Sequence, residues 1–172
     1  VGASGAKKAF IFARDPSTGV WGTAAVTSID GYTSHGSFGR VVAMTDNYAI
    51  VGAYGAKKAF IFARDSSTGV WDTTAVASID GYTDHDDFGF GIAMTDNTAI
   101  VGSFGAKKAF VFSRDPSTDS WGTTAVTTLS YTDQSHFSYA IAISANYVIV
   151  GDHGVKMAWI FANRCSPGRY SA

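Results

Sequence analysis

The sequence predicts an all-β fold in which one four-stranded antiparallel unit is repeated along the chain. Residues 1–50 and 51–100 align without a gap and differ at only 12 positions, a third copy starts at Val101, and a partial fourth copy starts at Val150. Each copy contains short β-branched and apolar runs separated by turn residues, and no segment keeps a helical period. Four short strands in a unit of about 50 residues, repeated, are typical of β-propeller blades.

The copy that begins at Phe88 shows how its first two strands are expected to form. Residues 88–95 are an apolar stretch of strand length, and residues 98–103 are a β-branched run. Asp96 and Asn97 lie between them, and both side chains bond locally to backbone and tolerate left-handed conformations. The two runs and the tight turn therefore predict a hairpin.

The second half of the same copy predicts two more strands. Residues 107–114 alternate between two faces, with Lys108, Phe110 and Phe112 on one of them. A loop follows at Asp-Pro-Ser-Thr, because proline fixes φ and offers no N–H donor. The Thr- and Val-rich run 121–129 is expected to be the fourth strand.

Large aromatic side chains recur in phase with the repeat. Such residues bury about 150–250 Å² each, and this regular placement suits packing between neighbouring blades. We therefore expect them in the core rather than in ligand sites. They are Trp21, Trp71 and Trp121, Phe10, Phe60 and Phe110, Phe12, Phe62 and Phe112, and Phe38, Phe88 and Phe137.

Two short motifs resemble the FG-GAP repeat of integrin-α-like β-propellers. Phe88-Gly89 enters a strand and Val101-Gly102-Ser103 follows the hairpin; the other copies carry Phe38-Gly39 with Val51-Gly52-Ala53, and Phe137-Ser138 with Val150-Gly151-Asp152. The proline of the family's Gly-Ala-Pro is absent, and Ser4, Tyr54 and Phe104 stand in its place. The resemblance implies a propeller that binds a protein or glycan partner in an extracellular or lumenal setting.

The resemblance does not extend to the calcium loops that such repeats often carry. The corresponding turns are only 45–47, 95–97 and 144–146, each with at most one carboxylate. Calcium needs six to eight oxygen ligands, which so tight a turn cannot supply. We therefore expect neither a metal nor another cofactor.

The expected blades divide the chain unevenly. Residues 1–162 form the propeller segment: a part-blade at 1–29, blades at about 38–87 and 88–136, a part-blade at 137–162, and then a tail at 163–172. That makes about three and a half blades, whereas propellers close with about four to eight. Three arrangements would complete the ring: further blades in a longer protein, a second copy of the chain, or pairing of the two ends into a four-bladed ring.

Composition and motifs exclude several classes of function. A net charge of −1 gives no overall bias toward nucleic acid or anionic membrane, and no apolar run approaches membrane-spanning length. Cys165 is the only cysteine, so no internal disulfide forms. The sequence lacks the Gly-x-Ser-x-Gly, His-Glu-x-x-His and Walker patterns. We therefore predict that the chain is not an enzyme.

Candidate binding residues lie in the loops after the second and fourth strands, which share one face of a propeller. Loops on a rigid scaffold commonly carry binding. The lysine pairs also suit solvated strand ends, and the acidic loop suits a solvated surface as well as a cation site. The partner-binding candidates are Lys7, Lys8, Tyr54, Lys57, Lys58, Phe104, Lys107, Lys108, Asp84, His85, Asp86 and Asp87.

Positions where the copies differ are the second guide to function, because the shared positions build the fold. These are Ser4/Tyr54/Phe104, Arg40/Phe90/Tyr139 and the loop 34–37 with its counterparts. The recurring Arg14-Asp15, Arg64-Asp65 and Arg114-Asp115 pairs are instead expected to cap turns or form ion pairs. We expect a non-enzymatic binding or assembly module; the alternatives are a structural subunit of a large complex and an accessory domain of a propeller enzyme.

Overall fold

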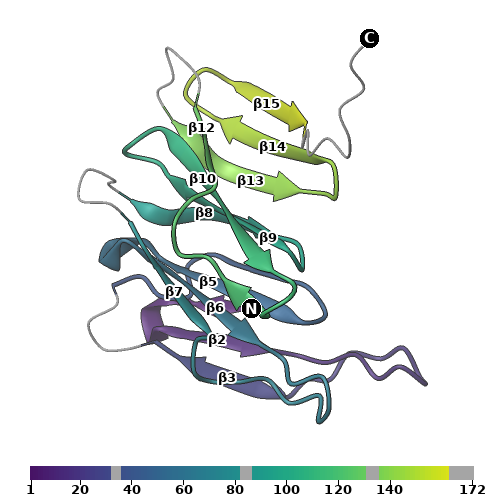
Figure 1. The fold of residues 1–172 in the computed structure, drawn as a ribbon. Helices are drawn as coiled ribbons and strands as arrows, with labels where there is room; N and C mark the ends of the chain where they lie inside the picture. Colours follow the sequence, from purple (N-terminus) through teal and green to yellow (C-terminus); the bar gives the residue numbers. More distant parts are fainter. Residues whose placement is uncertain (32–35, 82–86, 131–135, 163–172) are drawn as a thin grey trace.

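The computed structural model describes residues 1–31, 36–81, 87–130 and 136–162, which form four antiparallel β-sheets. The sheets follow one another in chain order and lie one above the next (Figure 1). The expectation of an all-β fold built from repeated antiparallel units is confirmed. In the described part of the chain, no helix has the length and apolar character needed to cross a membrane.

The four sheets are named first to fourth along the chain. The first contains β1 (Gly2–Ala3), β2 (Lys8–Ile11) and β3 (Thr27–Asp30). The second contains β4 (Val42–Met44), β5 (Tyr48–Ala53), β6 (Lys58–Ala63) and β7 (Ala77–Asp80). The third contains β8 (Phe88–Met94), β9 (Thr98–Ser103), β10 (Lys108–Asp115), β11 (Ser120–Trp121) and β12 (Thr127–Leu129). The fourth contains β13 (Phe137–Ile143), β14 (Tyr147–Asp152) and β15 (Met157–Ala162). The single-turn 3-10 helices η1 (Ser4–Ala6) and η2 (Tyr54–Ala56) follow β1 and β5.

The predicted hairpin of the third sheet is correct, with the turn at Asp96-Asn97 joining β8 to β9. The predicted single strand 121–129 is wrong, because it is split into β11 and β12. Gly122 N–H donates to the carbonyl of Ser113, and Val126 N–H donates to that of Val111. Between these two hydrogen bonds the chain advances by four residues, from Gly122 to Val126, while β10 advances by only two. The two extra residues therefore bulge out of the sheet.

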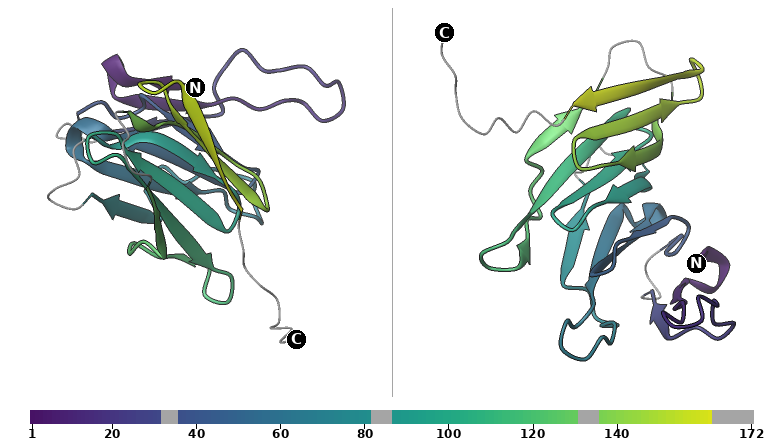
Figure 2. Two further views of the ribbon diagram at one scale, coloured as in Figure 1. Left: turned by 90° about the horizontal axis from the view of Figure 1, so that it is seen from above. Right: turned by 90° about the vertical axis from the view of Figure 1, so that its right-hand side faces the viewer.

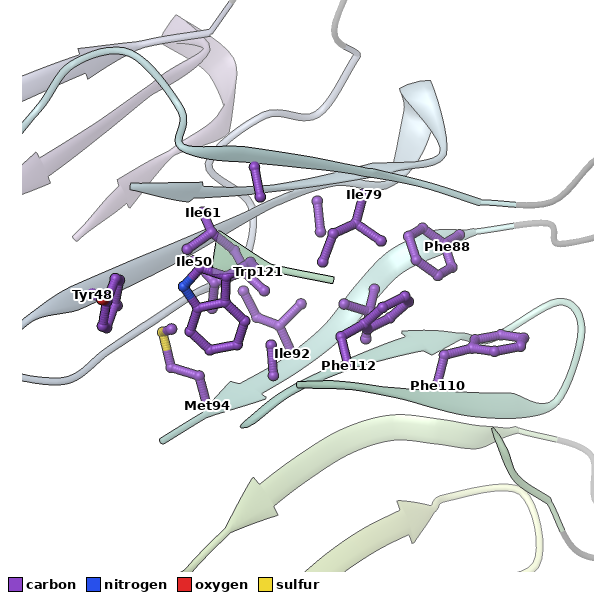
Figure 3. Close-up of a cluster of buried hydrophobic side chains, with 14 residues drawn as sticks. Tyr48, Ile50, Ile61, Ile79, Phe88, Ile92, Met94, Phe110, Phe112 and Trp121 are labelled. Carbon is purple, nitrogen blue, oxygen red and sulfur yellow. The ribbon is translucent and has the colours of Figure 1, made fainter. Parts of the chain in front are cut away.

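One packing arrangement joins the second sheet to the third. Tyr48, Ile50 and Ile61 point from the second sheet toward Phe112 and Trp121 of the third, and all five are buried (Figure 3). We call these two surfaces the aliphatic face of the second sheet and the aromatic face of the third. Burying each large apolar side chain contributes about 1.5–3 kcal/mol of gross transfer free energy.

The same arrangement recurs at the other two junctions. Ile11 and Ile29 of the first sheet pack against the aromatic face of the second, which carries Phe60, Phe62 and Trp71. The third sheet likewise packs its aliphatic side against the fourth, in a cluster that includes Ile100, Ala109, Phe137, Trp159 and Phe161. The expectation that the phase-locked aromatics pack between neighbouring sheets is therefore confirmed at the three junctions. It is wrong for Trp21, which is 64% exposed, and Phe10 and Phe12 are only half-buried, because no described sheet packs on the outer side of the first sheet.

Close contact between backbones explains the Phe-Gly and Val-Gly motifs. A Cβ on Gly52 would lie 2.2 Å from the carbonyl oxygen of Gly89, which belongs to the next sheet. Gly89 has φ +91°, and a Cβ there would lie 2.4 Å from the carbonyl oxygen of Lys58. Gly2 and Gly39 repeat this contact between the first and second sheets. Glycine is needed here because adjacent sheets approach to backbone contact.

The Arg-Asp corners cap turns, as expected. Asp65 Oδ1 accepts hydrogen bonds from the N–H and hydroxyl of Ser67 and from the N–H of Thr68, while Arg64 Nε donates to the carbonyl of Gly69. The Ser67 hydroxyl is the largest of the causes that lower the pKa of Asp65 to about 2. Asp15 and Asp115 accept equivalent bonds, which lower the pKa of both.

Replacing Gly52 with alanine should destabilise the fold by about 1–3 kcal/mol, because the added methyl meets backbone that cannot rotate away. Chemical denaturation followed by tryptophan fluorescence measures the change. Gly5→Ala is the matched control, since no heavy atom lies within 4 Å of a Cβ built there; it should shift stability by less than about 0.5 kcal/mol. Equal effects of the two substitutions would contradict the close contact between sheets.

Ser67→Ala should raise the pKa of Asp65 from about 2 toward the ordinary aspartate value of 3.8, because it removes the hydrogen bond that lowers this pKa most. Since the folded carboxyl has the lower pKa, the turn's contribution to stability is present above the unfolded pKa and is lost as pH falls toward 2. The chemical shift of the Asp65 carboxyl carbon, followed in an NMR titration, measures this pKa. Ser66→Ala removes a hydroxyl that is not a donor to this carboxylate and should leave the titration unchanged.

Candidate functional site

Side chains from three sheets meet in one partly exposed group, which we call the aromatic row. It is built largely from two positions that recur in every sheet with a first and second strand: the second residue after the conserved Phe, and the residue that follows the second strand. Its members are Arg40, Tyr54, Phe90, Phe104, His136, Tyr139 and His153.

A β-bulge points the first of these positions out of the sheet. In the third sheet, Phe88 pairs with Ser103 and Ile92 pairs with Val101, so three residues of β8 face one residue of β9. Phe90 lies in the middle of this bulge. A register shift between Phe137 and Ala140 places Tyr139 in the same way in β13. Bulges re-aim side chains in this manner and are common at functional sites.

The close approach of the sheets brings the rings into contact. Tyr54 meets Phe90 of the next sheet edge-on, with ring centroids 5.4 Å apart. Phe90 stacks on Phe104 of its own sheet at 5.5 Å and meets Tyr139 of the fourth sheet at 5.0 Å. Aromatic pairs at 4.5–7 Å contribute about 0.5–1.5 kcal/mol beyond their buried area. The row is therefore a continuous apolar surface that crosses the boundaries between sheets.

Cationic and titratable groups flank both ends of the row. At one end the Arg40 guanidinium lies 5.0 Å from the Phe90 ring centroid and 5.5 Å from that of Tyr54. At the other end the ring centroids of His136 and His153 lie 4.2 Å apart, and those of His153 and Tyr139 lie 4.6 Å apart. Arg40, Tyr139 and His153 are exposed, whereas Tyr54, Phe90 and Phe104 are half-buried. The row can thus offer ring faces, a guanidinium and two imidazoles to a partner.

The predicted lysines lie in and beside the turns that carry the row. Lys57 has φ +54° and its N–H donates to the carbonyl of Tyr54, and Lys107 has φ +56° and donates to Phe104. Lys7 occupies the same position after Ser4. Each of these lysines thus closes a tight turn that begins at a variable position.

The lysines that follow them start strands. Lys8 pairs with Asp30 at 2.6 Å, and Lys58 pairs with Asp80. Ser130 stands where the third copy would need the matching aspartate, and Lys108 is exposed. Exposed pairs of this kind contribute at most about 1 kcal/mol, so they mark strand ends more than a binding surface.

The acidic loop is described only at its last residue. Asp84, His85 and Asp86 lie outside the described residues. Asp87 has φ +58°, and its carbonyl accepts a hydrogen bond from Phe90 N–H, so it supports the turn that leads into the row. Among residues 1–31, 36–81, 87–130 and 136–162, no three His, Cys, Asp or Glu side chains are grouped so that they could hold a metal ion.

Sequence comparison of the copies identified most of the row but not how it assembles. Tyr54 and Phe104 were candidates, and Arg40, Phe90 and Tyr139 were variable positions. The prediction missed His153, although it is the fourth copy's counterpart of Tyr54 and Phe104. Extending the series Ser4/Tyr54/Phe104 to the partial fourth copy identifies His153.

A polar pocket of about 630 Å³ lies at the opposite ends of the strands, between the second and third sheets. In this pocket Asp119 accepts hydrogen bonds from Tyr48 and Arg114, both at 2.5 Å. The Tyr48 hydroxyl is the largest cause of the lowered pKa of Asp119, and burial raises the pKa of Tyr48. These hydrogen bonds connect Tyr48 of the second sheet to Arg114 and Asp119 of the third.

No protein-family model matches this chain, and no curated protein matches it.

Proposed function

We propose that the chain is a non-enzymatic recognition module, a segment of an FG-GAP-like β-propeller that binds a protein partner along the aromatic row. One observation carries this proposal: two positions at which the copies carry different side chains, Ser4/Tyr54/Phe104 and Arg40/Phe90/Tyr139, come together in the row. Positions shared by the copies pack the sheets and keep the backbones close. Side chains at these two variable positions therefore lie together on one accessible surface, where binding residues are commonly found.

Three features of the fold support a propeller segment. Successive sheets stack face to face in chain order, and the first strand of the third sheet, β8, lies beside both β5 and β13. The glycine contacts bring neighbouring sheets together at one end of these strands. In a propeller the first strands line the central channel, which would put the aromatic row at the channel mouth.

The composition of the row favours a protein over other partners. Interfaces between proteins are enriched in Tyr, Phe and Arg and depleted in other charged residues at their centre. Half-buried rings also lose little conformational freedom on binding, because their neighbours already hold them. Tyr54, Phe90, Phe104 and Tyr139 with Arg40 fit this description. The resemblance to FG-GAP repeats adds an extracellular or lumenal setting to the proposal.

A random-sequence peptide display library, screened on the purified chain beside a glycan array, tests the proposal. Phe90→Ala should weaken the selected peptides by about 2 kcal/mol, roughly 30-fold, since truncating a central aromatic anchor has this effect. Arg40→Gln should weaken them less, because it removes only the guanidinium at the end of the row. Calorimetry on individual peptides measures both losses.

Val70→Ser is the matched control, since Val70 is exposed on a hairpin tip away from the row. It should leave peptide affinity unchanged. Peptides that bind Phe90→Ala as tightly as the unsubstituted chain would contradict the proposed site. Binding to glycans alone, lost in Phe90→Ala, would keep the site and replace the class of partner.

A further inference from the structure

The outer face of the fourth sheet repeats six positions of the aliphatic face of the second sheet, although it has no described counterpart of β7, which contributes Ala77 and Ile79 to that face. The second sheet uses these side chains to pack on the third. In the fourth sheet, β-register places their counterparts together on the side opposite the third sheet. The matching pairs are Ala43/Ala142, Tyr48/Tyr147, Ile50/Ile149, Ala59/Ala158, Ile61/Ile160 and Ala63/Ala162.

These counterparts differ sharply in exposure. Ile50 and Ile61 are fully buried in the second sheet, whereas Ile149 is 41% and Ile160 is 70% exposed in the fourth. Among the described residues, no element covers this outer face (Figure 1). Among these residues, a surface that matches the one packed on the aromatic face of the third sheet is therefore uncovered.

The first sheet presents the complementary surface. Its outer side carries counterparts of four residues of the third sheet's aromatic face, and all four are identical: Val1/Val101, Phe10/Phe110, Phe12/Phe112 and Trp21/Trp121. Trp121 is buried against Tyr48, whereas Trp21 is 64% exposed. The first and fourth sheets lie at opposite ends of the stack, so one chain cannot bring these two faces together (Figure 2).

We propose that the fourth sheet of one copy packs its aliphatic face on the aromatic face of the first sheet of a second copy. The contact would follow the junction between the second and third sheets, where the rings of Tyr48 and Trp121 meet edge-on at 5.4 Å. Tyr147 of one copy therefore contacts Trp21 of the other. Because the two surfaces differ, the contact is head-to-tail, and it leaves one face free on each copy.

The intermolecular contact is weaker than its internal template. Gly19 stands where the third sheet has Asp119, so the hydroxyl of Tyr147 has no counterpart of the Tyr48–Asp119 hydrogen bond. The first sheet also lacks an equivalent of β8, which contributes Phe88 and Ile92 to the internal junction. Association is thus reversible and depends on concentration.

Sedimentation velocity on the 172-residue chain tests the proposal with two substitutions. Ile160→Lys puts a charge on the aliphatic face, and Trp21→Lys puts one on the aromatic face. The unsubstituted chain should associate as its concentration rises, and each variant alone should remain a monomer. An equimolar mixture of the two variants should form a dimer, since each retains the face that the other has lost.

Several results would overturn the proposal. They are an unsubstituted chain that stays monomeric throughout the concentration range, a single variant that still associates, and a mixture that forms no dimer. Both side chains are mostly exposed, so circular dichroism should show intact folding; Ile149→Lys replaces Ile160→Lys if it does not. Phe90→Ala should associate as the unsubstituted chain does, so failure of the aromatic row as a binding site leaves this test unaffected.

Discussion

The contact between an aliphatic face and an aromatic face is the interaction on which the rest of the structure depends. It recurs at all three junctions, with isoleucine and alanine on one side and phenylalanine and tryptophan on the other. Each sheet packs its aliphatic face on the aromatic face of the next sheet, so all the sheets are stacked in the same orientation. Any sheet with both faces can therefore be followed by another of the same kind. Glycines at positions 52 and 89 then let the backbones touch. Without that approach, the variable rings of successive sheets would lie too far apart to form one surface.

Repetition separates the architecture from the surface that we propose is functional. A junction that is copied with little change tolerates little variation, because well-packed cores resist changes in volume. Positions beside the glycines are free of this constraint, and there the copies carry Arg40, Phe90 and Tyr139 in turn. The bulges that hold Phe90 and Tyr139 direct them away from the core. The fold thus supplies a fixed frame on which a few substitutions change the chemistry of the exposed row.

Local pattern predicted much of the fold. The strands at 88–94 and 98–103 and the turn between them follow from an apolar stretch, a β-branched run and turn chemistry within a short segment. The break between Trp121 and Val126 was missed, since it depends on which carbonyls of β10 the chain meets. The aromatic row could be suspected from variable positions, but its assembly required the stacking of sheets, which places Tyr54 of one sheet on Phe90 of the next. The pairing of Lys58 with Asp80 likewise depends on strand register rather than on sequence proximity.

A double-mutant cycle between Tyr48 and Trp121 tests the central claim most directly, because the claim is that opposite faces of successive sheets are energetically coupled. Tyr48→Ala and Trp121→Ala should couple by about 0.5–3 kcal/mol in the free energy of unfolding. Trp71 packs in the preceding junction, against the first sheet; Trp71→Ala should combine with Tyr48→Ala additively, within about 0.5 kcal/mol. Additive effects of Tyr48 and Trp121, or equal coupling of Tyr48 to both tryptophans, would contradict the account.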